Sequence, residues 1–265
     1  MSERKHLSVA LSIAGSDSGG GAGIQADLKT FASLGVHGAS AITCLTAQNP
    51  KGVLGIQPCS ANMLARQLEA VMGVFSPAAI KTGMLYSAPL IDVVAGFFEQ
   101  QRPALLVVDP VMVATSGGRL LKPSAIKTLC QRLLPISALV TPNLREAEVL
   151  TGSQVVSVED LRAAARELRA RFGCAALVKG GHLRGLSEAV DIFYDGQEEL
   201  LLSAPFVRGI STHGTGCTYS AAVTAYLARG CSLAVAVRKA KEYITQAIAQ
   251  SQLAAGYNVL NSFWK

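Results

Sequence analysis

Five consecutive residues, His213, Gly214, Thr215, Gly216 and Cys217, stand at the start of a segment with helical periodicity. Glycines leave backbone N–H groups accessible at a helix start, where the helix dipole also favours negative charge, so the run predicts an anion hole. Phosphoryl transfer needs such a hole because its transition state spreads negative charge over the transferred oxygens. An ordinary glycine-rich turn into a helix is the competing interpretation.

Two acidic residues stand where they could help to bind a metal ion. Asp109 ends the apolar run Leu-Leu-Val-Val, so its carboxylate is expected in or near a cleft. Asn143 and Glu146 are three residues apart at a predicted helix start and therefore face the same way. A carboxylate there can hold Mg2+ through water, since Mg2+ keeps several of its waters. For Glu146, a helix cap with an acidic first turn is the competing interpretation.

A second glycine-rich loop, residues 14–27, follows the first apolar run. Its glycines allow the backbone to approach a ligand closely. The loop has no G-x-G-x-x-G, and the chain has no G-K-[ST], which argues against a dinucleotide oxidoreductase and a P-loop NTPase. A tight strand-to-helix turn explains the loop equally well.

The elements that must position these residues alternate between short apolar runs and amphipathic stretches. This alternation predicts a mostly parallel sheet with helices on both faces, and residues 188–194 and 199–202 predict a hairpin. In such sheets ligands bind at the carboxyl ends of the strands, where this chain places polar residues and glycines. The predicted strands are 9–13, 39–45, 78–80, 104–108, 138–140 and 175–178, and the predicted helices lie near 25–34, 61–75, 88–100, 123–134, 145–151, 158–172, 215–229 and 232–254.

The 265 residues are half apolar and no linker composition divides them, so we expect one α/β domain over residues 1–265. The formal charge of +6 comes from scattered residues and aromatics are few, which argues against nucleic-acid binding. The six cysteines show no disulfide or metal-ligand pattern, which favours a reducing compartment. No run approaches the roughly 18 apolar residues of a membrane span, so a cytoplasmic protein is expected.

Seven segments together resemble the hydroxymethylpyrimidine/phosphomethylpyrimidine kinases, a branch of the ribokinase superfamily. The most specific is 213–222, because many ribokinase relatives carry Asp where this chain has Cys217. The resemblance implies a three-layer α/β/α ribokinase-like fold with a mostly parallel central sheet. The segments are AGSDSGGGAGIQADLKT (14–30), TAQN (46–49), KTGML (81–85), VVDPVMVATSG (107–117), LVTPNLREAEVL (139–150), VKGGHL (178–183) and HGTGCTYSAA (213–222).

The resemblance implies that Asp27, Gln48 and Met84 line a pocket for the pyrimidine, with Gly15 and Val111 nearby. Residue chemistry agrees, since the Gln48 amide can both donate to and accept from an aminopyrimidine, and Met84 offers a soft apolar wall.

For the nucleotide, the resemblance implies that Asp109 and Glu146 arrange Mg2+ around the ATP phosphates. Lys179 and Asn143 would lie beside the nucleotide, and residues 214–216 would form the anion hole. Cys217 would take the position of the base. A helix N-terminus lowers a thiol pKa, so the Cys217 thiolate is expected to be favoured.

The implied activity is ATP-dependent phosphorylation of 4-amino-5-hydroxymethyl-2-methylpyrimidine and then of its monophosphate, in thiamine biosynthesis, by a homodimer. A pyridoxal or pyridoxine kinase is the nearest alternative, and a non-catalytic pyrimidine-binding protein is a further one. Position 48 is Gln where some relatives have Glu, and the C-terminal residues match the family only loosely. His182 and His213 lie in site loops, but neither has a carboxylate partner nearby in sequence, so neither is assigned as a base.

Overall fold

The computed structural model describes residues 6–101, 105–112, 121–183, 185–207 and 213–264. Within these residues nine strands form one sheet in the order β3-β2-β1-β4-β5-β6-β7-β8-β9, and a separate small hairpin follows near the C-terminus. The strands are β1 (Val9–Asp17), β2 (His37–Asn49), β3 (Gly52–Pro58), β4 (Ala79–Thr82), β5 (Leu106–Val108), β6 (Leu139–Val140), β7 (Ala175–Lys179), β8 (Glu188–Tyr194), β9 (Glu199–Pro205), β10 (Gln252–Ala254) and β11 (Tyr257–Val259).

Helices connect most of the strands and start close to where the sequence predicts them. Capping boxes fix the starts of α5 and α6, and left-handed glycines, Gly152 and Gly173, end both of these helices. The helices are α1 (Gly23–Ser33), α2 (Ala61–Phe75), α3 (Ala88–Gln101), α4 (Pro123–Thr128), the π turn Leu129–Leu133, the 3-10 turn Leu134–Ile136, α5 (Leu144–Thr151), α6 (Val158–Phe172), α7 (Thr215–Ala228) and α8 (Leu233–Ala249).

The centre of the sheet is parallel, which confirms the predicted class. Strand β1 pairs in parallel with β2 and β4, and the parallel pairing continues through β5, β6 and β7. Strands β3, β8 and β9 are antiparallel and lie at the two edges. The predicted hairpin is β8–β9.

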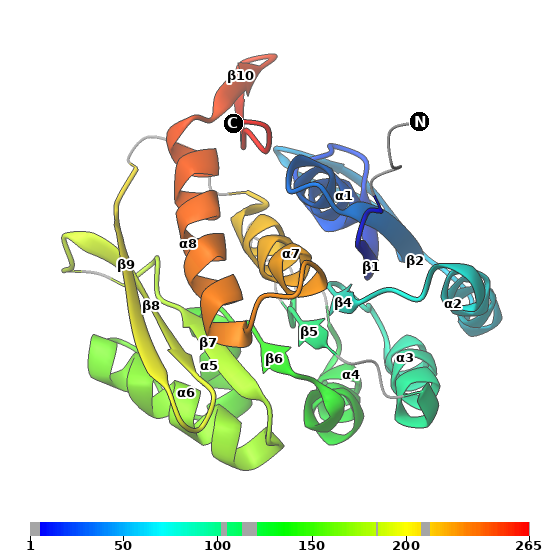
Figure 1. Cartoon of the computed structure of the whole chain (residues 1–265), viewed down its shortest axis with the longest axis horizontal. Helices are drawn as coiled ribbons and strands as arrows, with labels where there is room; N and C mark the ends of the chain where they lie inside the picture. The colour runs from blue at the N-terminus through cyan, green and yellow to red at the C-terminus, as the bar shows by residue number, and fades with distance from the viewer. Residues whose placement is uncertain (1–5, 102–104, 113–120, 184, 208–212, 265) are drawn as a thin grey trace.

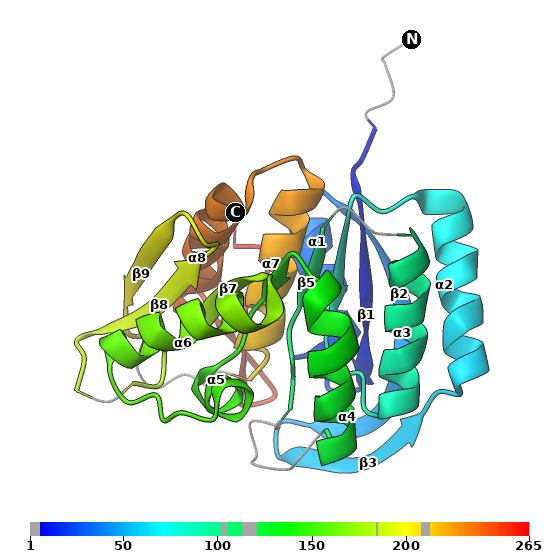
Figure 2. The same ribbon diagram turned by 90° about the horizontal axis from the view of Figure 1, so that it is seen from below.

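Alternate residues of the central strands pack on opposite faces of the sheet and form two cores. Leu106 and Val108 of β5 face a core shared with α2 to α6, whereas Val107 faces a core shared with α1, α7 and α8. Figures 1 and 2 show the resulting three layers, with α2 to α6 on one face and the other helices on the opposite one. The predicted α/β/α arrangement is therefore confirmed.

Strand β3 is absent from the sequence prediction. Pro50 and Lys51 form a turn, and β3 returns antiparallel to β2. Gln48 and Asn49 therefore lie at the end of a long strand and not in a loop after it. The turn residues are a recognisable signal, but the half-exposed β3 lacks the continuous apolar run by which the other strands were found.

The end of the last predicted helix is also wrong. The helix stops at Ala249, and residues 252–254 belong to β10 of the small hairpin. The turn of this hairpin holds Ala255 and Gly256 at positive φ, where the chain reverses between β10 and β11. Residue 104 of a predicted strand and residues 113–117 of the matching segment 107–117 lie outside the described residues. Among the helices that are described, none combines the length and the apolar character that a membrane crossing requires.

Candidate active site

The carboxyl ends of the parallel strands meet at one edge of the sheet, and the start of α7 lies there too. A Cβ atom on Gly216 would lie 3.3 Å from Lys179 Nζ and 4.0 Å from Asp109 Oδ2. The predicted anion hole is thus next to the ends of β5 and β7. Three of the residues predicted to handle phosphates therefore lie together.

Asp109 follows β5 and is almost fully buried. Lys179 Nζ lies 3.2 Å from its Oδ1, and Ser220 Oγ donates to its Oδ2 over 2.9 Å. Burial by itself would raise the pKa of Asp109, but Lys179, Lys81 and the Ser220 hydrogen bond together hold that pKa below its usual range. Asp109 is therefore a carboxylate at neutral pH, paired with a lysine ammonium.

Glu146 has the helix-cap geometry that was its competing interpretation. Its Oε2 accepts from Asn143 N over 2.9 Å while Asn143 Oδ1 accepts from Glu146 N over 3.0 Å, which is a capping box. Its Oε1 accepts from Met112 N over 3.1 Å. Burial raises the pKa of Glu146, and Lys179 opposes this while Asp109 adds to it. This cap is compatible with the predicted role of Glu146 in metal binding, because the charge of Asp109 still acts on the Glu146 carboxyl group.

The loop that Glu146 holds contains Val111 in a strained conformation. Its φ is +42°, a left-handed value that a β-branched side chain rarely adopts. Strain of this kind persists where neighbours over-determine the backbone, and here the bond from Met112 N to Glu146 supplies one constraint. Val111 was predicted to lie near the substrate, and the strained backbone makes this loop a candidate ligand contact.

Cys217 lies in the first turn of α7 and is partly exposed. Burial of the sulfur, with the charges of Asp109 and Asp27, raises the pKa of this thiol to about 11, although Lys81 and a hydrogen bond from the Gly23 backbone lower it. This direction is opposite to the one expected from the helix position alone. Desolvation and the two carboxylates raise the pKa of the Cys217 thiol by more than the N-terminus of the helix lowers it. The thiol is therefore neutral in the free protein.

Lys81 was given no role from sequence, yet it is the most enclosed charge of the site. Its Nζ lies 2.9 Å from both oxygens of Asp27, and both side chains are 0% exposed. Ser12 Oγ donates to Asp27 Oδ2 over 2.6 Å. Burial alone would lower the pKa of Lys81, but Asp27, Cys217 and Asp109 raise it, so the ammonium persists. The available signal was a lysine directly after the apolar run 78–80.

Two of the residues predicted to line the substrate pocket are in contact with each other. A Cβ atom on Gly15 would lie 2.9 Å from Met84 Cε and 2.8 Å from Cys44 Sγ, so Gly15 and Met84 are in contact. Asp27 is engaged by Lys81 and Ser12 and offers no exposed atom. Gln48 lies near the end of β2, where its backbone exchanges hydrogen bonds with the Ser18 hydroxyl of the first loop. The roles of these residues toward a ligand remain predictions.

His213 does have a carboxylate partner, which sequence reasoning missed because 196 residues separate the two. Its Nε2 lies 3.2 Å from Asp17 Oδ2 and 3.4 Å from Gln48 Nε2. Asp17 also accepts from the backbone N–H groups of Gly19, Gly21 and Ala22. The pair thereby joins the two glycine-rich loops.

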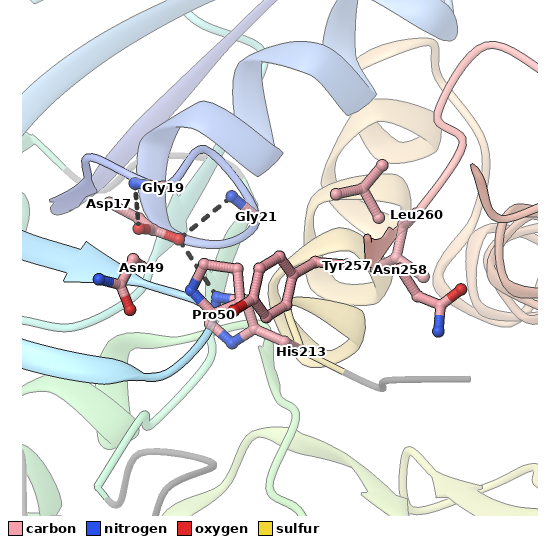
Figure 3. A pocket seen from close by; sticks show the side chains of 10 residues that line it. Asp17, Gly19, Gly21, Asn49, Pro50, His213, Tyr257, Asn258 and Leu260 are labelled. Carbon is pink, nitrogen blue, oxygen red and sulfur yellow. Dashed lines mark hydrogen bonds and ion pairs between the residues drawn. The ribbon is translucent and has the colours of Figure 1, made fainter. Parts of the chain in front are cut away.

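Beside this pair is a pocket of about 90 Å³ that the C-terminal hairpin helps to line. The residues that line it come from the first loop, the turn after β2, the start of α7 and the C-terminal segment (Figure 3); they include Asp17, Asn49, Pro50, His213, Tyr257, Asn258 and Leu260. The C-terminal hairpin is thus a neighbour of the first glycine loop.

The described residues fit a nucleotide with Mg2+. The buried hydroxyls of Thr141 and Thr215 have no hydrogen-bond partner among the described residues, as expected of groups that face a polar ligand. Within those same residues no three His, Cys, Asp or Glu side chains gather into a metal cage. Mg2+ is usually held by one or two carboxylates together with phosphates and water, and Asp109 and Glu146 suit that arrangement.

Solved structures that resemble this fold include small-molecule kinases. Pyridoxal kinase from Bacillus subtilis, in an ADP complex, superposes with a TM-score of 0.88 at 36% identity, covering 97% of this chain and 98% of that one. Phosphomethylpyrimidine kinase from Clostridium difficile superposes with a TM-score of 0.81 at 42% identity, covering 91% and 99%. Fold and site together define a kinase of the ribokinase-like class.

Within that class, the chain belongs to the phosphomethylpyrimidine kinase family, whose model matches residues 17–261. Hydroxymethylpyrimidine/phosphomethylpyrimidine kinase from Rhizobium meliloti is 49% identical over 91% of this chain and 90% of its own length. The enzyme of that name from Streptomyces coelicolor is 48% identical, over 96% and 94%. A thiamine biosynthesis bifunctional protein of Geobacter sulfurreducens is 46% identical over 95% of this chain, which spans about half (51%) of that protein.

Proposed function

We propose that this chain transfers the γ-phosphoryl group of ATP to the hydroxymethyl group of 4-amino-5-hydroxymethyl-2-methylpyrimidine, and then to the resulting monophosphate, in thiamine biosynthesis. The observation that carries the proposal is the family relationship along residues 17–261, in which full-length relatives bear this activity in their names. The geometry agrees with it, because the anion-hole glycines, the Lys179–Asp109 pair and Cys217 lie at one edge of the sheet.

The pyrimidine would lie between the first loop and the ends of β2 and β4. Gly15, with no side chain, lets a flat ring approach the backbone beside Met84, and Gln48 would read the ring's polar edge. Val111 would contact the other face of the ring. Asp27 would contribute by holding Lys81 in place through their ion pair.

The ATP phosphates would lie over the start of α7. Backbone N–H groups of Gly214, Thr215 and Gly216 would receive the γ-phosphoryl oxygens, with Lys179 as a compensating point charge and Asn143 beside the nucleotide. Asp109 and Glu146 would hold Mg2+, which neutralises phosphate charge during transfer. Cys217, as thiolate, would accept the proton of the attacking hydroxymethyl group.

One site can serve both steps because the second acceptor is already an anionic phosphate oxygen. Such an acceptor needs little proton removal, and positioning with charge neutralisation does most of the work in phosphoryl transfer. We further propose that residues 1–265 form one domain, that the protein acts as a homodimer, and that it works in the cytoplasm.

A pyridoxal or pyridoxine kinase is a second candidate function. Pyridoxal kinase from Staphylococcus aureus, bound to AMP-PCP and pyridoxal, superposes with a TM-score of 0.89 at 34% identity, covering 98% of this chain and 94% of that one. Its substrate is also a flat heteroaromatic ring with a hydroxymethyl group, so the same pocket plan would serve.

A single assay separates the two functions. Purified protein with MgATP is offered hydroxymethylpyrimidine, its monophosphate or pyridoxine, and ADP release is followed by a coupled assay. We expect kcat/KM for both pyrimidines to exceed that for pyridoxine by at least tenfold. A preference for pyridoxine would overturn the proposal in favour of the second candidate.

Replacing Glu146 with glutamine tests the metal site. The amide keeps one carbonyl, which can still accept from Met112 N but not also from Asn143 N, and it removes the charge. We therefore expect a higher Mg2+ concentration at half-maximal rate and a lower kcat. Folding should be largely retained, because burial already raises the pKa of Glu146 and the neutral form is not disfavoured. An unchanged Mg2+ titration would remove Glu146 from the metal site and leave it as a helix cap.

A further inference from the structure

Lys179 is the last residue of β7, and its backbone is held on both sides. Its own N–H donates to Pro142 O over 2.9 Å, on the side of β6. The next N–H along the chain, that of Gly180, donates to Asp191 Oδ1 of β8 over 2.9 Å. The two N–H groups that flank the Lys179 Cα atom therefore both have a partner, and only the second partner is a side chain.

The chain passes very close to β8 at Gly180. Lys179 and Asp191 are register partners in the antiparallel β7–β8 pair, and β7 ends at Lys179. A Cβ atom on Gly180 would lie 2.3 Å from Val190 O and 2.6 Å from Leu161 Cδ1, so only glycine permits this approach. The Asp191 carboxylate thus bonds the first N–H beyond the end of β7, in the place of a carbonyl of the sheet.

The other oxygen of Asp191 is bonded by a lysine from a distant helix. Lys241 Nζ of α8 donates to Asp191 Oδ2 over 2.7 Å and to Ala189 O over 3.0 Å. Both side chains of the pair are buried, and α8 lies over this part of the sheet (Figure 1). With Oδ2 bonded to Lys241, Oδ1 is the oxygen that remains for Gly180 N.

The far end of Lys179 lies between two parts of the proposed phosphate site. Its Nζ is 3.2 Å from Asp109 Oδ1, and a Cβ atom on Gly216 would lie 3.3 Å from that nitrogen. A lysine side chain has many rotamers and loses much conformational entropy when its end is fixed. The position of the ammonium group is therefore defined well only if the backbone that carries it is also fixed.

We propose that Asp191 is a positioning residue for nucleotide binding. By bonding Gly180 N it fixes the backbone of Lys179 and so holds the Lys179 ammonium group beside the start of α7. The role of Lys179 toward the ATP phosphates is taken from the proposed function, on which this inference rests. A lysine that is already held in place binds a phosphate without first losing backbone freedom, so the affinity for the nucleotide is higher.

Two double variants test the hydrogen bond from Gly180 without the buried charges. Lys241→Met with Asp191→Asn removes both charges and keeps a carbonyl that can accept from Gly180 N. Lys241→Met with Asp191→Leu removes both charges and also that acceptor, with a side chain of similar shape. The loss of the Lys241 hydrogen bonds is common to both variants, so a difference between them reports the bond to Gly180.

Nucleotide binding is the quantity to measure. The dissociation constant of AMP-PCP with Mg2+ is obtained by titration calorimetry, and the KM for hydroxymethylpyrimidine is obtained with MgATP. We expect the Asp191→Leu double variant to bind AMP-PCP roughly five- to tenfold more weakly than the Asp191→Asn double variant, the loss of about one hydrogen bond. The KM for the pyrimidine should differ less than about twofold between them, because the lost bond acts on a residue that faces the nucleotide.

A third substitution separates positioning of Lys179 from a general structural role. When Lys179→Met is added to both double variants, the two should bind AMP-PCP equally, since the ammonium group that Asp191 positions is gone. Each variant is checked by thermal unfolding. If the Asp191→Leu form does not fold, Asp191→Ala, which also lacks an acceptor, takes its place.

Equal affinities for AMP-PCP in the two double variants, or a difference that persists without Lys179, would overturn the inference and leave Asp191 as a structural contact of β8. Wild-type protein that binds AMP-PCP with Mg2+ but phosphorylates no pyrimidine would instead overturn the proposed function. The two failures are therefore distinguishable.

Discussion

Cys217→Ala is expected to slow phosphoryl transfer to the hydroxymethyl group by about 10²- to 10⁴-fold, the usual range for a lost general base. Transfer to the monophosphate should fall far less, because that acceptor is already anionic. The structure adds a pH dependence to this expectation. With a thiol pKa of about 11, the reactive thiolate is a small fraction at neutral pH and falls about tenfold with each pH unit below that pKa.

The wild-type rate of the first step should therefore rise from pH 7 to 9. Cys217→Asp places a carboxylate that is ionised throughout this range, so it should recover part of the first step and flatten its pH profile. Alkylation of Cys217 by iodoacetamide should show the same steep rise with pH in the wild type. Cys231→Ala, which changes a partly buried cysteine between α7 and α8, is the control for thiol loss. If Cys217→Ala leaves both steps as fast as in the wild type, Cys217 only fills space in the first turn of α7.

Lys81→Met is expected to cost about 3–5 kcal/mol of the free energy of unfolding, because it leaves the Asp27 carboxylate buried without its positively charged partner and with only the hydrogen bond from Ser12. Both side chains are fully enclosed, so water cannot compensate the loss. Urea unfolding measures the change. Lys81→Met combined with Asp27→Asn removes both charges and should recover much of the stability; if it does not, the loss is one of packing.

The same pair should affect the reactivity of Cys217 in opposite directions. Lys81 lowers the thiol pKa and Asp27 raises it, so Lys81→Met should slow alkylation of Cys217 at pH 8 while Asp27→Asn should accelerate it. Lys241→Met breaks a comparable Lys–Asp pair, Lys241 with Asp191 over 2.7 Å, and should lower stability without changing the reactivity of Cys217. A shift in the same direction for Lys81→Met and Asp27→Asn would show that the pair acts on packing and not through charge.

The layered fold could be read from the sequence because its signals are local. A buried parallel strand appears as a short apolar run and a surface helix as a 3.6-residue period, so strands such as β7 and helices such as α6 lie close to their predicted bounds. β3 and the C-terminal hairpin were missed since both are largely exposed and lack such a run. Parallel topology also places the ends of all central strands at one edge, which is why Asp109 and Lys179 could be expected together before their 3.2 Å contact was seen.

The sequence by itself thus determined the class of fold, the family and the residues at the strand ends. Only the tertiary structure decided how those residues pair and in which protonation state they stand. Lys81 meets Asp27 across 54 positions of the chain, and His213 meets Asp17 across 196. The Cys217 thiol has a raised pKa despite its helix start, because burial and distant carboxylates outweigh a local dipole. Periodicity and turn residues act over a few neighbours, whereas burial and charge depend on whatever the fold brings close.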